Sequence, residues 1–186
     1  MKRIFFDLDG TLIFTELELN RKRDMCFKLG RGKQWYSTDI RPSAHELIEF
    51  ARDIVGPENV WVLTIASGDY ARTINSMASF GFTDEQIVSR EIIQDHRVKG
   101  AYGAVYTQVM ESISDSENFL IDDLPSRENE SKLGILGIRN LENYLKISEF
   151  FGKPQFNTGV SQQEFLAKYE HDFTASVKTF LTNKVK

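Results

Sequence analysis

The chain has little of what disulfide-linked, secreted or membrane-spanning proteins need. Its 186 residues include one cysteine, Cys26, so no disulfide can form within the chain and a reducing compartment is expected. The apolar start of the chain stops at Asp7, too early for a signal peptide, and no apolar run is long enough to cross a bilayer. These absences predict a soluble, cytoplasmic protein without a membrane partner.

An excess of basic charge is also missing. Lysine and arginine together number 23 against 27 aspartates and glutamates, which gives a formal net charge of −4. This balance argues against a broad basic face for nucleic acid or an anionic membrane. A local basic pocket for a single phosphate is still compatible with it. The partner we expect is therefore a phosphorylated substrate, with a nucleic-acid end among the candidates.

Short apolar runs predict the strands of a buried sheet. They cover residues 4–6, 60–63, 119–121 and 135–138, with a weaker run at 87–88. None shows the in–out alternation of a half-exposed strand, as expected for parallel strands covered on both faces.

Amphipathic helical patterns lie between these runs, at residues 42–55, 68–81 and 103–113. Strand–helix alternation of this kind predicts an α/β fold, a Rossmann-like open parallel sheet with helices on both faces.

Two segments depart from the alternation. Residues 13–40 form a charged insertion after the first strand, expected to be a helix plus a flap that makes a small cap. Residues 155–186 contain the capping box "SQQE" and then one apolar stripe. We expect a catalytic core at 1–154 and a C-terminal helical extension packed on it. The stripe consists of Phe165, Leu166, Tyr169, Phe173, Val177, Phe180 and Leu181.

Carboxylates follow two of the predicted strands. Asp7 and Asp9 come after the first strand, Asp122 and Asp123 after the third, and Thr64 closes the second. In open α/β sheets the carboxyl ends of the strands form the ligand site. Several carboxylates placed there repel one another unless protons or a cation are bound, and an all-oxygen set suits Mg²⁺. The alternative is that each aspartate caps a helix or closes a turn.

These residues resemble the motifs of the haloacid dehalogenase-like superfamily. "DLDGTL", residues 7–12, is similar to its first motif, Thr64 to its second, Lys99 to its third, and "FLIDD", residues 119–123, to its fourth. The resemblance spans residues 1–140 and implies a phosphatase with this fold.

A narrower resemblance links the chain to the carboxy-terminal-domain phosphatases. It is carried by "IRPSAHELIEFA", "LTIASGDYA" and "FLIDDLPSRENESKLGI". Gly10 stands where that branch usually has glutamate, and Ile65 interrupts its Thr-Ala-Ser motif. The "IDD" ending is also similar to the 3′-phosphatase part of polynucleotide kinases and to the deoxyribonucleotidases.

The resemblance implies a role for each carboxylate. Asp7 would attack phosphorus and form an aspartyl-phosphate, and Asp9 would act as general acid and then general base. Asp7 and Asp122 would hold Mg²⁺ through side-chain oxygens, with the Asp9 carbonyl as a third ligand. Asp123 would bind the metal or orient its ligands.

Phosphate-binding roles are implied in the same way. The Thr64 hydroxyl and the Lys99 ammonium would bind the phosphoryl oxygens. Gly10 and Thr11 would shape the turn that approaches the phosphate. Taken alone, Lys99 beside Gly100 is typical of a surface lysine, and only the order of the motifs favours the catalytic role.

The substrate stays open at this point. A nucleotide, a nucleic-acid end and a phosphoprotein all fit the motifs. Alternatives to hydrolysis are phosphoryl transfer to another acceptor and a weakly active binding or regulatory module. The intact acidic set argues against the module, because a protein without catalysis has no physical need for carboxylates that repel one another.

Overall fold

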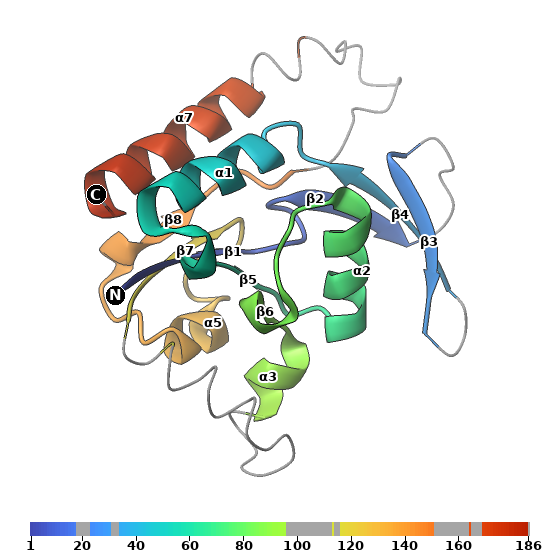
Figure 1. Ribbon diagram of the computed structural model, residues 1–186, viewed down its shortest axis with the longest axis horizontal. Coiled ribbons are helices and arrows are strands. Elements are labelled where there is room, and N and C mark those ends of the chain that lie inside the picture. Colours follow the sequence, from blue (N-terminus) through green and yellow to red (C-terminus); the bar gives the residue numbers. More distant parts are fainter. Residues whose placement is uncertain are drawn as a thin grey trace.

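A five-stranded parallel sheet forms the centre of the computed structural model, which describes residues 1–17, 23–30, 34–95, 113, 116–150, 164 and 169–185 (Figure 1). The strand order is β6-β5-β1-β7-β8, and every neighbouring pair is parallel. Its strands are β1 (Lys2–Phe6), β5 (Val60–Leu63), β6 (Ile87–Val88), β7 (Glu117–Asp122) and β8 (Tyr144–Lys146).

Helices cover both faces of this sheet, which confirms the predicted fold class. On β1, Ile4 and Phe6 join one buried cluster with α1, α2 and α7, whereas Phe5 joins a second cluster with α3 and α5. Figure 1 shows α1 and α7 side by side on one side of the sheet, away from α3 and α5. The helices are α1 (Ala44–Val55), α2 (Gly68–Ala78), α3 (Arg90–Asp95), α5 (Glu130–Ile135) and α7 (His171–Phe180), with short turns at η1 (Pro57–Asn59), η2 (Asp84–Gln86), η3 (Leu141–Asn143) and the π-helical η6 (Leu181–Val185).

Where the structure describes it, at residues 13–17, 23–30 and 34–40, the insertion after β1 is a second sheet and not the predicted helix plus flap. Strands β2 (Ile13–Leu17), β3 (Met25–Leu29) and β4 (Gln34–Ile40) pair antiparallel in the order β2-β4-β3. Aromatic rings explain where it docks, because Phe27 stacks on Tyr36 at 5.4 Å and both lie within about 6 Å of the Tyr70 ring on α2. The small sheet therefore lies against α2, beyond the carboxyl end of β1.

The strand predicted at 135–138 is wrong. Helix α5 continues to Ile135, Gly137 takes a left-handed φ of +63°, and the edge strand of the sheet is β8. The apolar run is buried in either conformation, so its hydrophobicity did not distinguish a helix end from a strand.

The helix predicted at 68–81 ends earlier than expected. Ser79 adopts a left-handed φ of 56° directly after Ala78 and caps α2 with its backbone N–H. The helix predicted at 103–113 lies outside the described residues, apart from Ile113, as does most of the "SQQE" capping box.

The C-terminal helix α7 packs against α1. Phe173, Val177 and Leu181 of the apolar stripe are buried in the main core cluster, and Tyr169 is exposed. Phe165 and Leu166 lie outside the described residues. Within the described part of the chain, no helix has the length and apolar character needed to span a membrane.

Candidate active site

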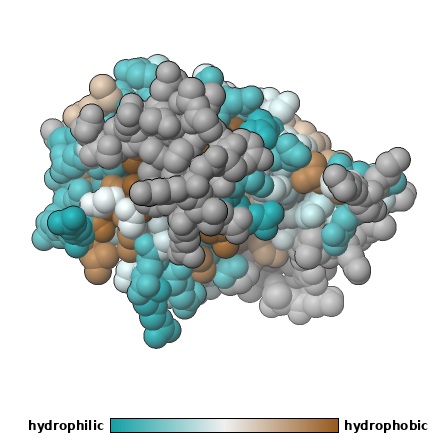
Figure 2. Space-filling model, turned by 90° about the horizontal axis from the view of Figure 1, so that it is seen from below, coloured by the Kyte–Doolittle hydropathy of each residue, from teal (hydrophilic) through white to brown (hydrophobic). Residues whose placement is uncertain are grey.

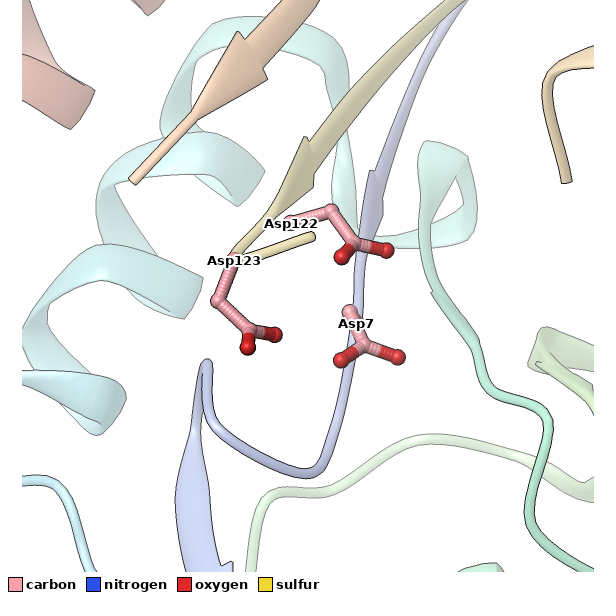
Figure 3. A group of neighbouring side chains, drawn as sticks. All are labelled: Asp7, Asp122 and Asp123. Carbon is pink, nitrogen blue, oxygen red and sulfur yellow. The ribbon is translucent and has the colours of Figure 1, made fainter. Parts of the chain in front are cut away.

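Three carboxylates meet at the carboxyl ends of β1 and β7. Asp7 directly follows β1, and its backbone N–H donates to the Ile121 carbonyl of β7 at 2.9 Å, next to Asp122. Ligand oxygens of Asp7, Asp122 and Asp123 all lie within 4.8 Å of one another. Figure 3 shows their carboxylates directed toward a shared space. The parallel register of the two central strands therefore brings together three of the four carboxylates predicted at this edge, and the Asp9 side chain is not among them.

A buried lysine joins two of these carboxylates. Lys132 Nζ donates to Asp7 Oδ1 at 2.7 Å and to Asp122 Oδ2 at 2.6 Å, and its side chain is only 2% exposed. Lys132 lies within the segment "FLIDDLPSRENESKLGI" but was not predicted as a site residue, because a lysine between Ser131 and Leu133 is typical of a solvated helix face.

Burial dominates the electrostatics of the cluster. Burial raises the pKa of Asp7 well above its usual range; Lys132 opposes this, and the nearby Asp122 and Asp123 charges add to it. Burial and the Asp122 charge raise the pKa of Asp123 to about 6. Burial lowers the pKa of Lys132, but Asp7 and Asp122 outweigh it and the pKa is raised overall.

The donor set fits a hard divalent cation. The three carboxylates offer only oxygen ligands, and the single ammonium of Lys132 cannot neutralise all of them. Mg²⁺ prefers such oxygen ligands and retains positions for water or phosphate. The cluster therefore has the chemistry of a magnesium site.

Asp9 lies in a different environment from the cluster. The Tyr70 hydroxyl lies 2.5 Å from Asp9 Oδ1 and 2.7 Å from Thr15 Oγ1. Burial raises the pKa of Asp9, while the hydrogen bonds from Tyr70 and Thr15 lower it in part. Burial and the neighbouring Asp9 charge raise the pKa of Tyr70, so the phenol remains a proton donor. This setting suits a carboxyl that takes up and releases a proton.

The turn after Asp9 holds Asp123 in place. Gly10 has a left-handed φ of +78°, and a Cβ at this position would lie 2.7 Å from Asp123 Oδ2. The Thr11 hydroxyl donates to Asp123 Oδ1 at 3.4 Å. The Gly10 carbonyl accepts from the Phe150 backbone N–H at 2.6 Å and from Arg41 Nη2 at 3.5 Å. Phe150 and Arg41 thus hold the turn through the Gly10 carbonyl, while the Gly10 Cα and the Thr11 hydroxyl face Asp123.

The two predicted phosphate-binding side chains are placed differently. Thr64 lies at the carboxyl end of β5, the neighbour of β1, and its Oγ1 accepts from the Ala66 backbone N–H at 3.1 Å. Its side chain is therefore at the same edge of the sheet as Asp7. Lys99 lies outside the described residues, so its role stays a prediction.

An open parallel α/β sheet with carboxylates at the ends of two central strands is the arrangement that the haloacid dehalogenase-like motifs predicted. The profile of the NLI interacting factor-like phosphatases matches residues 2–178, and the chain belongs to this family. This membership confirms the class of enzyme predicted from the four motifs and the resemblance to carboxy-terminal-domain phosphatases.

Two solved structures are similar to the chain. One is the fission yeast RNA polymerase II CTD phosphatase Fcp1 in an arginine-to-alanine variant bound to beryllium fluoride, with 13% identity over 98% of this chain and 51% of that chain and a TM-score of 0.47. The other, described as Fcp1, an essential RNA polymerase II CTD phosphatase, gives 14% identity over 98% and 49% and a TM-score of 0.48. The chain thus spans about half the length of these structures. No curated protein matches it.

Gly10→Ala is predicted to weaken metal binding in addition to the fold. The left-handed φ costs any L-residue about 1–2 kcal/mol, and the new Cβ displaces the end of the Asp123 side chain. We expect the affinity for Mn²⁺, measured by calorimetry, to fall by about tenfold or more.

Gly30→Ala is the matched control, because Gly30 has a φ of +77° with nothing within 4 Å of the added Cβ. It should lose similar stability and keep the metal affinity of the wild type. Equal metal affinities in the two variants would contradict the role of this turn.

Without divalent metal, the protein is predicted to become more stable as the pH falls from about 7 to about 5. The folded Asp123 takes up a proton with a pKa of about 6, whereas the unfolded side chain does so only near pH 4. The folded state then binds more protons, so stability falls as pH rises, and the raised pKa of Asp7 acts in the same direction.

Thermal unfolding in EDTA across this pH range measures the effect. Asp123→Asn should flatten the trend, whereas Asp53→Asn, an exposed change on α1, should leave it as in the wild type. A melting temperature that falls steadily from pH 7 to pH 5 in the wild type would be the contrary result.

Proposed function

We propose that the chain hydrolyses a phosphate monoester through an aspartyl-phosphate on Asp7, with Mg²⁺ as its cofactor. The observation that carries this proposal is the buried group of Asp7, Asp122 and Asp123 at adjacent strand ends. An uncompensated cluster of this kind is costly, so its presence needs a chemical reason. Membership of a phosphatase family supports the same reaction.

The side chains of Asp7, Asp122 and Asp123, with the Asp9 carbonyl, would hold the magnesium ion. When bound, the ion would offset the repulsion between the Asp7 carboxylate and the anionic phosphate. Of these ligands, the Asp9 carbonyl rests on the family resemblance, and the three carboxylates rest on their proximity.

Asp7 and Asp9 divide the covalent chemistry between them. An oxygen of Asp7 attacks phosphorus, the bond from phosphorus to the ester oxygen breaks, and the leaving oxygen keeps the electron pair and takes a proton from Asp9. Asp9 then removes a proton from a water molecule that attacks the aspartyl-phosphate, which releases inorganic phosphate and restores Asp7. The hydrogen bond from Tyr70 keeps the Asp9 carboxyl in position for both steps.

The phosphoryl oxygens would be bound at the edge of the sheet beside Asp7. The Thr64 hydroxyl is placed there by β5, and the Gly10–Thr11 turn lies on the opposite side of Asp7 next to Asp123. Lys99 would supply the positive charge that the third motif implies. Positioned donors of this kind stabilise the charge that develops on the oxygens in the transition state.

The substrate we propose is a phosphate group on a large molecule, either a phosphoprotein or a nucleic-acid end, with a nucleotide as the smaller candidate. The three-stranded sheet β2-β4-β3 would serve as a small cap, and Ile65, beside Thr64, leaves 58% of its surface exposed. Hydrophilic residues cover much of the described surface on the face that Figure 2 shows. A cytoplasmic location remains part of this proposal.

Asp7→Asn should abolish turnover on every accepted substrate, with a loss of about a thousandfold or more, because an amide cannot serve as the nucleophile. The assay uses Mg²⁺ with an aryl phosphate, nucleoside monophosphates, 3′- and 5′-phosphorylated oligonucleotides and phosphopeptides. Asp53→Asn on the exposed side of α1 makes the same chemical change and should retain the wild-type rate. Turnover retained in Asp7→Asn would remove this residue from the nucleophilic role.

Asp9→Asn should slow the reaction in a way that depends on the leaving group. Alkyl phosphates need a proton on the departing oxygen, so their rate should fall by about 10²–10⁴-fold. An aryl phosphate with a stable leaving group should lose much less in the first step. Tyr70→Phe keeps the ring and removes the hydrogen bond to Asp9. Its rate should fall less than that of Asp9→Asn, and again more for alkyl phosphates than for the aryl phosphate. Equal losses for both leaving groups would contradict the general-acid role.

A further inference from the structure

Lys132 contributes a full positive charge inside the carboxylate cluster, and the proposed reaction does not use it. Its side chain is 2% exposed, and those of Asp7 and Asp122 are 6% and 0% exposed. Its ammonium lies 2.7 Å from Asp7 Oδ1 and 2.6 Å from Asp122 Oδ2. These are the distances of charge-assisted hydrogen bonds.

The need for this ammonium follows from the burial of its partners. A buried carboxylate without a counter-charge is strongly destabilising, and here two lie side by side. Within the described residues, Lys132 is the cation hydrogen-bonded to both of them. It therefore holds Asp7 and Asp122 together in the protein without metal.

The same position makes Lys132 a competitor of the metal. Asp122 Oδ1 already accepts from the Leu124 backbone N–H at 2.9 Å, and Asp122 Oδ2 accepts from Lys132. A cation that binds Asp7 and Asp122 either shares an oxygen with the ammonium or binds the other oxygen of the same carboxylate, directly beside it. Two positive charges that bind the same two buried carboxylates, the metal ion and the Lys132 ammonium, repel each other strongly.

We infer that Lys132 is a built-in counter-ion of the site, which keeps Asp7 and Asp122 in place before the metal binds and lowers the affinity of the site for its divalent cation. The inference rests on the proposed function, because it requires that these carboxylates bind metal. Lys132 acts through Asp7 and Asp122 and is therefore a positioning residue.

The test compares Lys132→Met with the wild type in the full chain, by thermal unfolding in EDTA and by calorimetric titration with Mn²⁺. Methionine keeps most of the side-chain length and apolar character and removes the charge. We expect the variant to melt at a lower temperature in EDTA and to bind Mn²⁺ about tenfold more tightly or better. Saturating Mn²⁺ should raise its melting temperature more than that of the wild type.

Lys146→Met is the matched control. Lys146 is an exposed lysine on β8, the strand beside β7, and its loss changes the net charge by the same amount. This variant should match the wild type in both measurements. Lys132→Arg, which keeps the charge, should bind Mn²⁺ less tightly than Lys132→Met.

A measurement on the wild type needs no variant and decides the question if Lys132→Met does not fold. Side-chain ¹⁵N NMR should show one protected lysine ammonium in EDTA, and Mg²⁺ should shift its signal. An ammonium signal that is absent, or that Mg²⁺ does not change, overturns the inference.

Two further outcomes separate the inference from the proposed function. If Lys132→Met equals the wild type in EDTA stability and in Mn²⁺ affinity, the inference fails and the proposed phosphatase reaction stands. If the wild type binds no Mn²⁺ through these carboxylates, both the metal in the proposed function and the inference fail.

Discussion

The repulsion among buried carboxylates is the constraint on which the site depends. Parallel pairing of β1 with β7 brings Asp7 and Asp122 to the same edge of the sheet, and Asp123 follows directly. Their proximity is tolerable only with bound protons or positive charge among them. Lys132 provides one such charge, and the remaining negative charge is what a divalent cation would satisfy.

The surrounding structure keeps two kinds of carboxyl apart. Asp7 lies among other carboxylates and an ammonium, whereas Asp9, two residues later, is held by the hydroxyl of Tyr70. Gly10 makes this separation possible, because its left-handed backbone turns the chain back beside Asp123. Arg41 then ties the Gly10 carbonyl to the core and stacks on Phe173 of α7 at 3.6 Å. The C-terminal helix is thereby linked to the site turn.

The sequence predicted the sheet and the carboxylates because hydrophobic strands and the acidic residues that follow them are local patterns. Lys132 escaped prediction because its burial depends on the tertiary contact of α5 with β7, which no local pattern records. The edge strand at Tyr144–Lys146 was missed because a more apolar run at 135–138 precedes it and instead ends a helix. The sheet β2-β4-β3 depends on aromatic contacts with α2, and the charge-rich composition of residues 13–40 does not indicate these contacts.

The most direct test of this account is the position of a divalent cation in the wild-type protein. Crystals grown with Mn²⁺ and measured for anomalous scattering should show one strong peak about 2 Å from oxygens of both Asp7 and Asp122. A peak that contacts only one of these side chains, or density at saturating Mn²⁺ with no ion between them, would contradict the claim that the carboxylates are assembled to hold a metal.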